Sequence, residues 1–249
     1  MTDFDGEVAV VTGGTRGIGR AVAEELAEGG ATVVATYHED EAAAERTETA
    51  LADSRADTAV ERFDVADYDA VAATFETVAE RFGAPSILVN NAGTMDNGLL
   101  LRMTPEQWQR IIDVNLTGTF NCTREAARWM LRSDDRGGRI VNVASVVAQR
   151  GWAGQANYAA SKAGVLGLTR TAARELGGKG IRVNAVAPGY TDTELLEGSQ
   201  GHESAVEADT ASGRVATPEE VAGVISFLAS DAASYVNGEV VRVDDGLAL

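Results

Sequence analysis

The chain has 249 residues, which is enough for one large α/β domain with an extensive core. It carries 38 acidic and 21 basic residues, a formal net charge of −17, and this acidity argues against nucleic acid and anionic membrane surfaces as partners. Cys122 is the single cysteine, and His38 and His202 stand in no ligand-spaced motif, so the sequence predicts neither an internal disulfide nor a metal site. No apolar run approaches membrane-spanning length and residues 1–3 do not resemble a signal segment, so we expect a cytoplasmic protein with residues 1–249 in a single domain.

Short apolar segments alternate with segments of helical periodicity along the whole chain. Strands are predicted at residues 7–12, 32–37, 59–63, 86–90, 138–144, 181–186 and 239–243. Helices are predicted at residues 17–29, 40–53, 68–82, 105–132, 157–177 and 218–230. This alternation predicts an α/β fold, with a doubly wound parallel sheet of about seven strands and helices on both faces. Ligands of such sheets bind beyond the carboxyl ends of the strands.

The first predicted strand leads into a glycine-rich turn, Thr12-Gly-Gly-Thr-Arg-Gly-Ile-Gly19, and a predicted helix follows. A dinucleotide-binding fingerprint requires this order of strand, turn and helix. The glycines let the backbone approach a pyrophosphate closely, and the negative charge of that group is favourable at the helix N-terminus. The turn therefore predicts a nucleotide site.

A tyrosine and a lysine, Tyr158 and Lys162, are four residues apart in the predicted helix 157–177, so both can face one pocket. A phenol has a pKa near 10, and a cation one turn away is expected to lower it and to make the pair an acid/base for an oxygen atom. Ser145 would supply a hydroxyl donor to the same oxygen, and Asn115 lies further upstream. Taken alone, a tyrosine and a lysine at this spacing also fit an ordinary amphipathic helix. The rest of the chain favours the chemical interpretation.

With these features together, the sequence resembles the short-chain dehydrogenase/reductase family over nearly its whole length. The resemblance is carried by Thr12–Gly19, Asp64-Val65, Asn90-Asn-Ala-Gly93, Asn115, Ser145, Tyr158-Ala-Ala-Ser-Lys162 and Pro188-Gly189. It implies a Rossmann-type sheet and a catalytic tetrad of Asn115, Ser145, Tyr158 and Lys162. In such a tetrad Tyr158 is the general acid/base and Ser145 polarises the substrate carbonyl. Lys162 binds the nicotinamide ribose and lowers the tyrosine pKa, and Asn115 holds a water molecule of a proton relay.

The resemblance also implies which residues bind a nicotinamide cofactor. They are Gly13, Thr15, Arg16, Gly17, Ile18, Gly19, His38, Asp64, Val65, Asn91, Ala92, Gly93, Tyr158, Lys162, Pro188, Gly189 and Thr191. Family members that prefer NAD usually have an acid at the position of Tyr37, and this chain has none there. Arg16 is placed to meet the 2′-phosphate of NADP, and a protonated His38 would help, whereas Glu39 and Asp40 act in the opposite direction. We expect NADP(H) to be favoured over NAD(H).

Within the family, four further segments resemble reductases of 3-oxoacyl thioesters. They are Gly137–Asn142, Gln155–Tyr158, Ile181–Asn184 and Asp244-Asp-Gly246. The pair Asp244-Asp245 departs from the usual pattern, in which asparagine or aspartate is followed by glycine. Residues 194–213 lack a firm apolar period and match the position of the family's mobile substrate lid. Trp152 follows Ser145 closely enough to line a substrate pocket.

The substrate stays open at this point. We expect NADPH-dependent reduction of a 3-oxoacyl thioester, either acetoacetyl-CoA or a 3-oxoacyl carrier protein, to the 3-hydroxyacyl thioester. A sugar or secondary-alcohol dehydrogenase would use the same tetrad, and a non-catalytic nucleotide-sensing protein is a remote alternative. Arg136 and Lys179 fall where carrier-protein reductases have docking cations, although Lys179 also suits a helix C-terminus. Because acyl carrier proteins are acidic, the net charge of −17 favours a CoA thioester.

Lysine is nearly absent, since Lys162 and Lys179 are the only lysines among 21 basic residues. Acid excess with lysine depletion resembles proteins adapted to molar salt, in which electrostatic repulsion is screened over about 3 Å. A protein that simply has a low pI is the alternative, but it does not explain the loss of lysine. We therefore expect a salt-adapted, halophilic protein, and the family resemblance implies a homotetramer.

Overall fold

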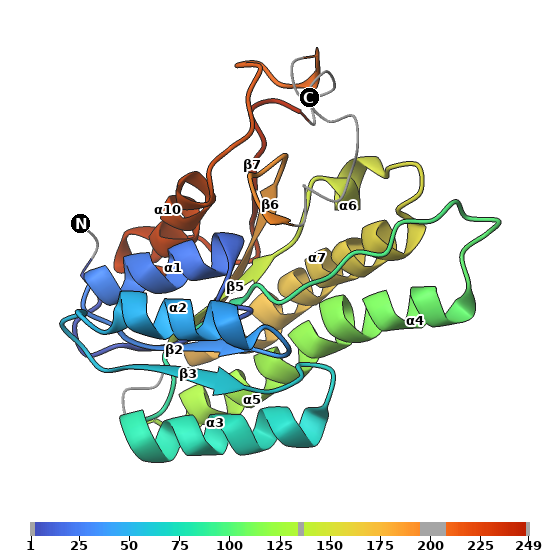
Figure 1. Ribbon diagram of the computed structural model, residues 1–249. Helices are drawn as coiled ribbons and strands as arrows, with labels where there is room; N and C mark the ends of the chain where they lie inside the picture. Colours follow the sequence, from blue (N-terminus) through green and yellow to red (C-terminus); the bar gives the residue numbers. More distant parts are fainter. Residues whose placement is uncertain (1–2, 134–136, 195–207, 248–249) are drawn as a thin grey trace.

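The computed structural model describes residues 3–133, 137–194 and 208–247. Its centre is a sheet of seven parallel strands in the order β3-β2-β1-β4-β5-β6-β7 (Figure 1). The strands are β1 Val8–Thr12, β2 Thr32–Tyr37, β3 Thr58–Arg62, β4 Ile87–Asn90, β5 Gly138–Val143, β6 Ile181–Pro188 and β7 Val240–Val243. All seven predicted strands form, and their bounds differ from the predicted ones by at most two residues.

Helices cover both faces of this sheet (Figure 1). They are α1 Gly17–Glu28, α2 Glu41–Leu51, α3 Tyr68–Phe82, α4 Pro105–Ile112, α5 Gly118–Arg132, α6 Val147–Arg150, α7 Ala156–Leu176 and α10 Pro218–Ala229. The starts of α4 and α10 are encoded locally, because Thr104 and Thr217 each form a capping box and a proline follows each of them. The short helix α6 was not predicted from the sequence.

The strands are apolar on both faces because each face packs against helices. Every residue of β1 is buried. On one face Val11 packs in a cluster with Leu26 of α1 and Ile225 of α10. On the other face Val10 packs in a cluster with Phe75 of α3 and with residues of α5 and α7. Full burial of such a side chain contributes about 1.5–3 kcal/mol relative to exposure, so the two clusters fix the helices on the sheet.

The predicted single helix at 105–132 is wrong in one respect. Helix α4 ends at Ile112, a π-helical turn covers Asp113–Thr117, and α5 begins at Gly118. A π turn inserts one extra residue without interrupting the chain of helical turns, so apolar periodicity does not reveal it. The turn contains Asn115, which is completely buried.

The sheet order places a crossover beside β1. The chain leaves β3 on one side of β1 and returns as β4 on the other side. The loops after β1 and β4 therefore meet at the carboxyl ends of adjacent strands, which is where ligands bind in open α/β sheets. Most of the predicted lid at 194–213 lies outside the described residues. The structure describes Glu194 and residues 208–213 of this segment.

The helices of the described ranges were searched for a membrane span, and none is both long and apolar enough to be one.

Candidate active site

The glycine turn between β1 and α1 leaves no room for larger side chains. Gly13 and Gly17 have φ angles of 60° and 47°, a region that favours glycine. A Cβ atom on Gly19 would collide with the carbonyl oxygen of Gly13 and with Asn91 Nδ2. Asn91 Nδ2 donates to the carbonyls of Thr12 and Gly13 at 3.1 and 2.9 Å, which ties the turn to the loop after β4.

The N-terminus of α1 opens toward this turn. Arg16 is the N-cap residue, and no side chain caps the helix there. The first N–H groups of an uncapped helix are ready partners for an anion. Thr15 is buried and its carbonyl accepts a hydrogen bond from Thr47 Oγ1 at 3.1 Å, while Ile18 packs against the core. The predicted nucleotide turn is thus fixed by a hydrogen bond from α2 and by packing against the core.

Thr12 organises the loop after β4. Its Oγ1 accepts hydrogen bonds from the backbone N–H groups of Asn91 and Ala92, both at 3.0 Å. This role of Thr12 was not predicted, although Thr12 is the first residue of the glycine motif. Gly93 follows, and a Cβ atom there would lie 3.4 Å from both Asn115 Oδ1 and Lys162 Nζ. The loop therefore brings the predicted cofactor residues next to the predicted catalytic ones.

Asn115 is held by three hydrogen bonds. Its Oδ1 accepts from the Thr94 N–H at 2.8 Å, and its Nδ2 donates to the Thr94 carbonyl at 3.0 Å. Nδ2 also lies 3.2 Å from Ser161 Oγ, which donates to the Tyr158 carbonyl at 2.8 Å. The π turn thus connects the loop after β4 to the first turns of α7.

Tyr158 is fixed at the start of α7 by its neighbour Asn157. The Asn157 Oδ1 accepts from the Tyr158 N–H at 2.8 Å, and the Asn157 Nδ2 donates to the Asp96 carbonyl at 3.0 Å. The Tyr158 ring is buried, and its side chain shares a hydrogen bond with Ser145, which follows β5. Asn157 was not among the predicted site residues, although it lies in the segment Gln155–Tyr158, which resembles reductases of 3-oxoacyl thioesters.

Lys162 lies on the same side of α7, as the spacing predicted. Its Nζ atom is 5.7 Å from the centroid of the Tyr158 ring and donates to the Val143 carbonyl at 2.8 Å. Both side chains are buried, and the structure brings Asn115, Ser145, Tyr158 and Lys162 together at the carboxyl end of β5.

The expected lowering of the tyrosine pKa is wrong for this arrangement. Burial raises the pKa of Tyr158 to about 12, and the hydrogen bond with Ser145 offsets only part of that rise. Burial also lowers the pKa of Lys162 to about 8. The loss of water around the phenol raises the pKa of Tyr158. Lys162 does not reverse this rise, and its Nζ atom donates to a backbone carbonyl.

The remaining predicted cofactor residues follow neighbouring strands. His38 after β2 and Asp64 after β3 approach each other, with Nε2 and Oδ2 4.0 Å apart. Val65 is buried against Gly118, where a Cβ atom would lie 2.5 Å from Val65 Cγ2. Arg16 is exposed, and its Nη1 lies 2.8 Å from Glu194 Oε2. All of these groups line the carboxyl edge of the sheet.

The loop after β6 completes this edge. Pro188 ends β6 and its carbonyl accepts from the Val146 N–H at 3.1 Å, next to Ser145. The Gly189 N–H donates to the Val243 carbonyl at 2.9 Å, and Thr191 is buried and pairs with Ala216. These contacts hold the loop between β5 and β7.

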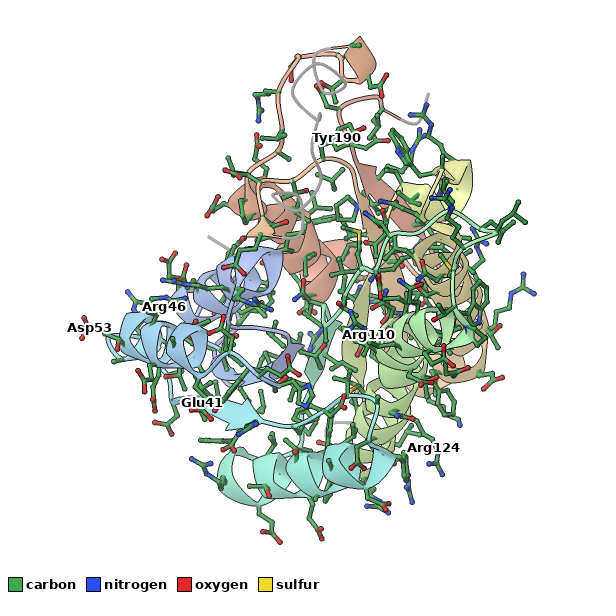
Figure 2. All side chains as sticks on the ribbon, turned by 45° about the vertical axis from the view of Figure 1, so that its right-hand side comes forward. Glu41, Arg46, Asp53, Arg110, Arg124 and Tyr190 are labelled. Carbon is green, nitrogen blue, oxygen red and sulfur yellow. The ribbon has the colours of Figure 1, made fainter. Side chains whose placement is uncertain are left out.

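The place of Trp152 in the wall of a substrate pocket stays a prediction, and the structure shows its contact with a second aromatic ring. Its ring meets that of Tyr190 edge to face, with centroids 6.1 Å apart. Figure 2 shows Tyr190 in the upper part of the molecule, beyond the sheet.

Asp245 stands where related reductases usually have glycine, and the structure shows which contacts the aspartate makes there. It has a φ of 48°, a left-handed conformation that glycine adopts without strain. Its Oδ2 accepts hydrogen bonds from both the N–H and the Oγ of Ser212, each at 2.6 Å. The aspartate therefore ties the C-terminal segment to residues 211–212 at the end of the predicted lid.

The structure describes one of the two predicted docking cations. Arg136 lies outside the described residues. Lys179 is exposed in a short turn after α7, at the opposite end of that helix from Tyr158. A helix of 21 residues separates the two by about 30 Å.

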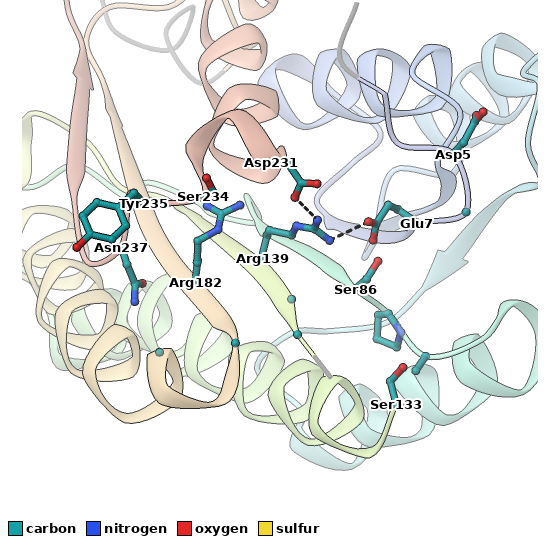
Figure 3. Close-up of a pocket in the computed structure, with 17 residues that line it drawn as sticks. Asp5, Glu7, Ser86, Ser133, Arg139, Arg182, Asp231, Ser234, Tyr235 and Asn237 are labelled. Atoms are coloured by element: carbon teal, nitrogen blue, oxygen red, sulfur yellow. Dashed lines mark hydrogen bonds and ion pairs between the residues drawn. The ribbon is translucent and has the colours of Figure 1, made fainter. Parts of the chain in front are cut away.

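A groove of about 940 Å³ lies at the amino ends of the strands, away from the site (Figure 3). Arg139 in its floor binds Glu7 and Asp231 at 2.8 and 2.6 Å. Arg182 beside it donates to the carbonyls of Leu228 and Ser230. The two arginines of this groove are thus engaged within the protein. In the described residues no histidine, cysteine, aspartate or glutamate side chains form a group of three that could hold a metal ion.

The profile of a protein family described as enoyl-(acyl carrier protein) reductase matches residues 13–248. The chain belongs to this family of short-chain dehydrogenases/reductases, and it is an oxidoreductase that acts on a hydroxyl or carbonyl group. A 3-oxoacyl-(acyl-carrier-protein) reductase of Synechocystis is 42% identical over 250 residues, 100% of each chain. Proteins of the same name from Vibrio harveyi and Thermotoga maritima are 41% and 42% identical over 98% and 99% of each chain.

Proposed function

We propose that this protein reduces a 3-oxoacyl thioester to the 3-hydroxyacyl thioester with NADPH. The three relatives support the thioester, since each is a 3-oxoacyl-(acyl-carrier-protein) reductase by name. The observation that carries the proposal is the buried connection from Asn115 through Ser161 to the Tyr158 backbone, with Lys162 and Ser145 beside it. A protein that only sensed nucleotides would have no use for this set of groups.

The glycine turn fits a dinucleotide. At Gly13 and Gly19 a Cβ atom would meet the loop after β4 or the turn itself, so glycine allows the tight turn that a pyrophosphate-binding backbone needs, and the uncapped start of α1 suits the charge of that group. Arg16 and His38 would hold the adenosine end, and Lys162 with the loop from Pro188 to Thr191 would hold the nicotinamide end. When bound, the cofactor supplies a hydride to the carbonyl carbon.

The protein's own groups supply the proton. The high pKa of Tyr158 keeps the phenol protonated at neutral pH, which is the form that reduction requires. Ser145 shares a hydrogen bond with Tyr158 and would orient the carbonyl oxygen toward it. As the carbonyl carbon is reduced, Tyr158 gives its proton to that oxygen. Lys162 then stabilises the phenolate until Tyr158 is reprotonated through a relay that Asn115 supports.

We favour a CoA thioester such as acetoacetyl-CoA over an acyl carrier protein. A carrier protein is acidic, and a surface of net charge −17 disfavours its approach. Figure 2 shows acidic and basic side chains such as Glu41, Arg46 and Asp53 pointing outward around α2. Lys179 is the predicted docking cation that the structure describes, and it lies at the far end of α7 from Tyr158.

The test is cofactor oxidation in molar KCl with acetoacetyl-CoA, a 3-oxoacyl carrier protein and a panel of sugars and alcohols. We expect the highest kcat/KM with acetoacetyl-CoA and NADPH. A higher value for the carrier protein that falls in Lys179→Ala would replace the CoA thioester as substrate. Turnover of sugars or alcohols alone would contradict the thioester, and binding of nucleotide without any turnover would favour a sensor.

The proposal includes a salt-adapted cytoplasmic homotetramer. Exposed aromatic side chains on two different helices support self-association, namely Phe120 of α5 and Phe227 of α10, which are 48% and 43% exposed. Light scattering after gel filtration in molar KCl would give the mass, and a monomer would contradict this assembly.

A further inference from the structure

Arg16 lies between two carboxylates. Its Nη1 atom is 2.8 Å from Glu194 Oε2 and 3.6 Å from Asp40 Oδ2. Asp40 also has a structural task, because its Oδ1 caps α2 by accepting from the Ala43 N–H at 2.9 Å. By distance Glu194 is the nearer of the two anions, and it lies 178 positions from Arg16 in the sequence.

The contact between Arg16 and Glu194 belongs to a broader packing of two segments. A Cβ atom on Gly17 would lie 3.0 Å from Thr193 Cγ2, so Thr193 packs against the glycine turn. Two residues earlier in the same segment, the chain is fixed by the bridge between Thr191 and Ala216, and the Asp192 N–H donates to the Ala216 carbonyl at 2.9 Å. Glu194 thus extends from an anchored segment, and its carboxylate meets Arg16 beside the adenosine end of the predicted cofactor site.

We infer that Glu194 is a specificity-determining residue that competes with the 2′-phosphate of NADPH for Arg16. This inference rests on the proposed function, in which Arg16 binds that phosphate. A phosphate and a carboxylate on the same guanidinium repel each other, so NADPH must displace or crowd Glu194. NADH has no 2′-phosphate and leaves the Arg16–Glu194 pair intact. Glu194 therefore weakens the binding of NADPH more than that of NADH, and bound NADPH releases the Glu194 carboxylate from Arg16.

The effect of Glu194 on the affinity for a 2′-phosphate should match the small free energy of an exposed ion pair. The Arg16 and Glu194 side chains are 55% and 61% exposed, so water screens their attraction. Removing the glutamate charge is expected to tighten binding of a 2′-phosphate by about two- to fivefold. Molar salt should reduce this factor, because it screens charges over a few ångströms.

The experiment measures binding of the adenosine end alone. Dissociation constants of 2′,5′-ADP and 5′-AMP are determined by calorimetry for the wild type and for Glu194→Gln, at molar KCl and at the lowest KCl that keeps the protein folded. Arg16→Ala and the double variant complete a thermodynamic cycle. Glu41→Gln is the matched control, because it removes the same charge next to Asp40 but from a residue that pairs with Arg62.

We expect Glu194→Gln to bind 2′,5′-ADP more tightly, to bind 5′-AMP as the wild type does, and to have no effect once Arg16 is alanine. An unchanged affinity for 2′,5′-ADP, an equal gain in Glu41→Gln, or a gain that persists without Arg16 would overturn the inference.

The same data separate this inference from the proposed cofactor. Equal wild-type affinities for 2′,5′-ADP and 5′-AMP would contradict the NADPH preference. If Glu194→Gln then gains affinity for 2′,5′-ADP through Arg16, the competition by Glu194 still holds. If it gains none, both proposals fail.

Discussion

Asn115 Nδ2 lies 3.2 Å from Ser161 Oγ, and this contact joins the π turn to the helix that carries Tyr158. We predict that Asn115→Ala lowers the free energy of unfolding by about 1–3 kcal/mol, because the buried Ser161 hydroxyl loses its donor and the half-buried Thr94 N–H loses its acceptor. We also expect kcat to fall, since the relay loses its support. Denaturant unfolding and steady-state kinetics measure the two effects.

Asn184→Ala is the matched control for this change. Asn184 is equally buried in β6 and bonds to the Val236 carbonyl and the Glu239 N–H, away from the site. It should lose similar stability and keep its kcat. Equal loss of kcat in both variants would mean that Asn115 is only structural.

Removal of the phenol hydroxyl should abolish the proton donor and keep the ring. We predict a loss of about 10²–10⁴-fold in kcat for Tyr158→Phe, the range typical of a general acid. Cofactor affinity, measured by nicotinamide fluorescence, should change little. Lys162→Ala should weaken both cofactor affinity and kcat. Near-normal turnover by Tyr158→Phe would contradict the mechanism.

Lys162 should make stability depend on pH in a defined window. Its pKa is lowered to about 8 in the folded protein, against an ordinary value of 10.5. The unfolded chain then binds more protons between these pH values, so Lys162 makes stability rise as pH increases from about 8 to 10.5. Each unit of pKa difference corresponds to about 1.4 kcal/mol. Lys162→Met should lose this rise in denaturant unfolding series, whereas Lys179→Met, at an exposed position, should keep it.

The glycine turn should not tolerate a methyl group at Gly19. We predict that Gly19→Ala loses nucleotide binding, because the new Cβ atom collides with the Gly13 carbonyl oxygen. Gly223→Ala in α10 is the control, since a Cβ atom there meets nothing within 4 Å. It should bind nucleotide normally and gain about 0.4–1 kcal/mol of stability. Calorimetric titration with NADPH and thermal melts would test both variants, and normal binding by Gly19→Ala would refute the close approach.

Salt should stabilise the folded protein. Lowering KCl from molar to tenth-molar concentration lengthens the screening distance from about 3 to about 10 Å, so the acidic surface repels itself more strongly. We expect the thermal midpoint to fall and the assembly to dissociate reversibly. Melts across this range are the measurement, and a midpoint that is independent of salt would leave the composition without this explanation.

The sequence predicts the parts of the fold that depend on local pattern. Apolar runs such as Val8–Thr12 become buried strands, and the threonine–proline pairs at Thr104 and Thr217 mark helix starts. The spacing of Tyr158 and Lys162 also places them on one side of α7. Each of these features depends only on residues that are close together in the sequence. The order of the family's motifs along the chain then indicates which segments form the site.

Other features depend on contacts that no local pattern contains. The direction of the Tyr158 pKa shift follows from burial and from the Val143 carbonyl that holds Lys162. The carboxylate that meets Arg16 comes from residue 194, 178 positions away in the sequence. Asn157 has an ordinary helical position in the sequence, and its bond to the Asp96 carbonyl appears only in the folded chain.

The π turn at Asp113–Thr117 also restricts how this chain can change in length. Deleting one residue there would allow regular α-helical bonding, and it would rotate the following helix by about 100° relative to α4. Asn115 and the core side chains of α5 could not then both keep their partners. Substitutions on the exposed side of α4 and α5 leave this geometry intact, whereas a one-residue gap does not. Spacing between Thr104 and Arg132 is therefore a more stringent constraint on this enzyme's descendants than the identity of most residues between them.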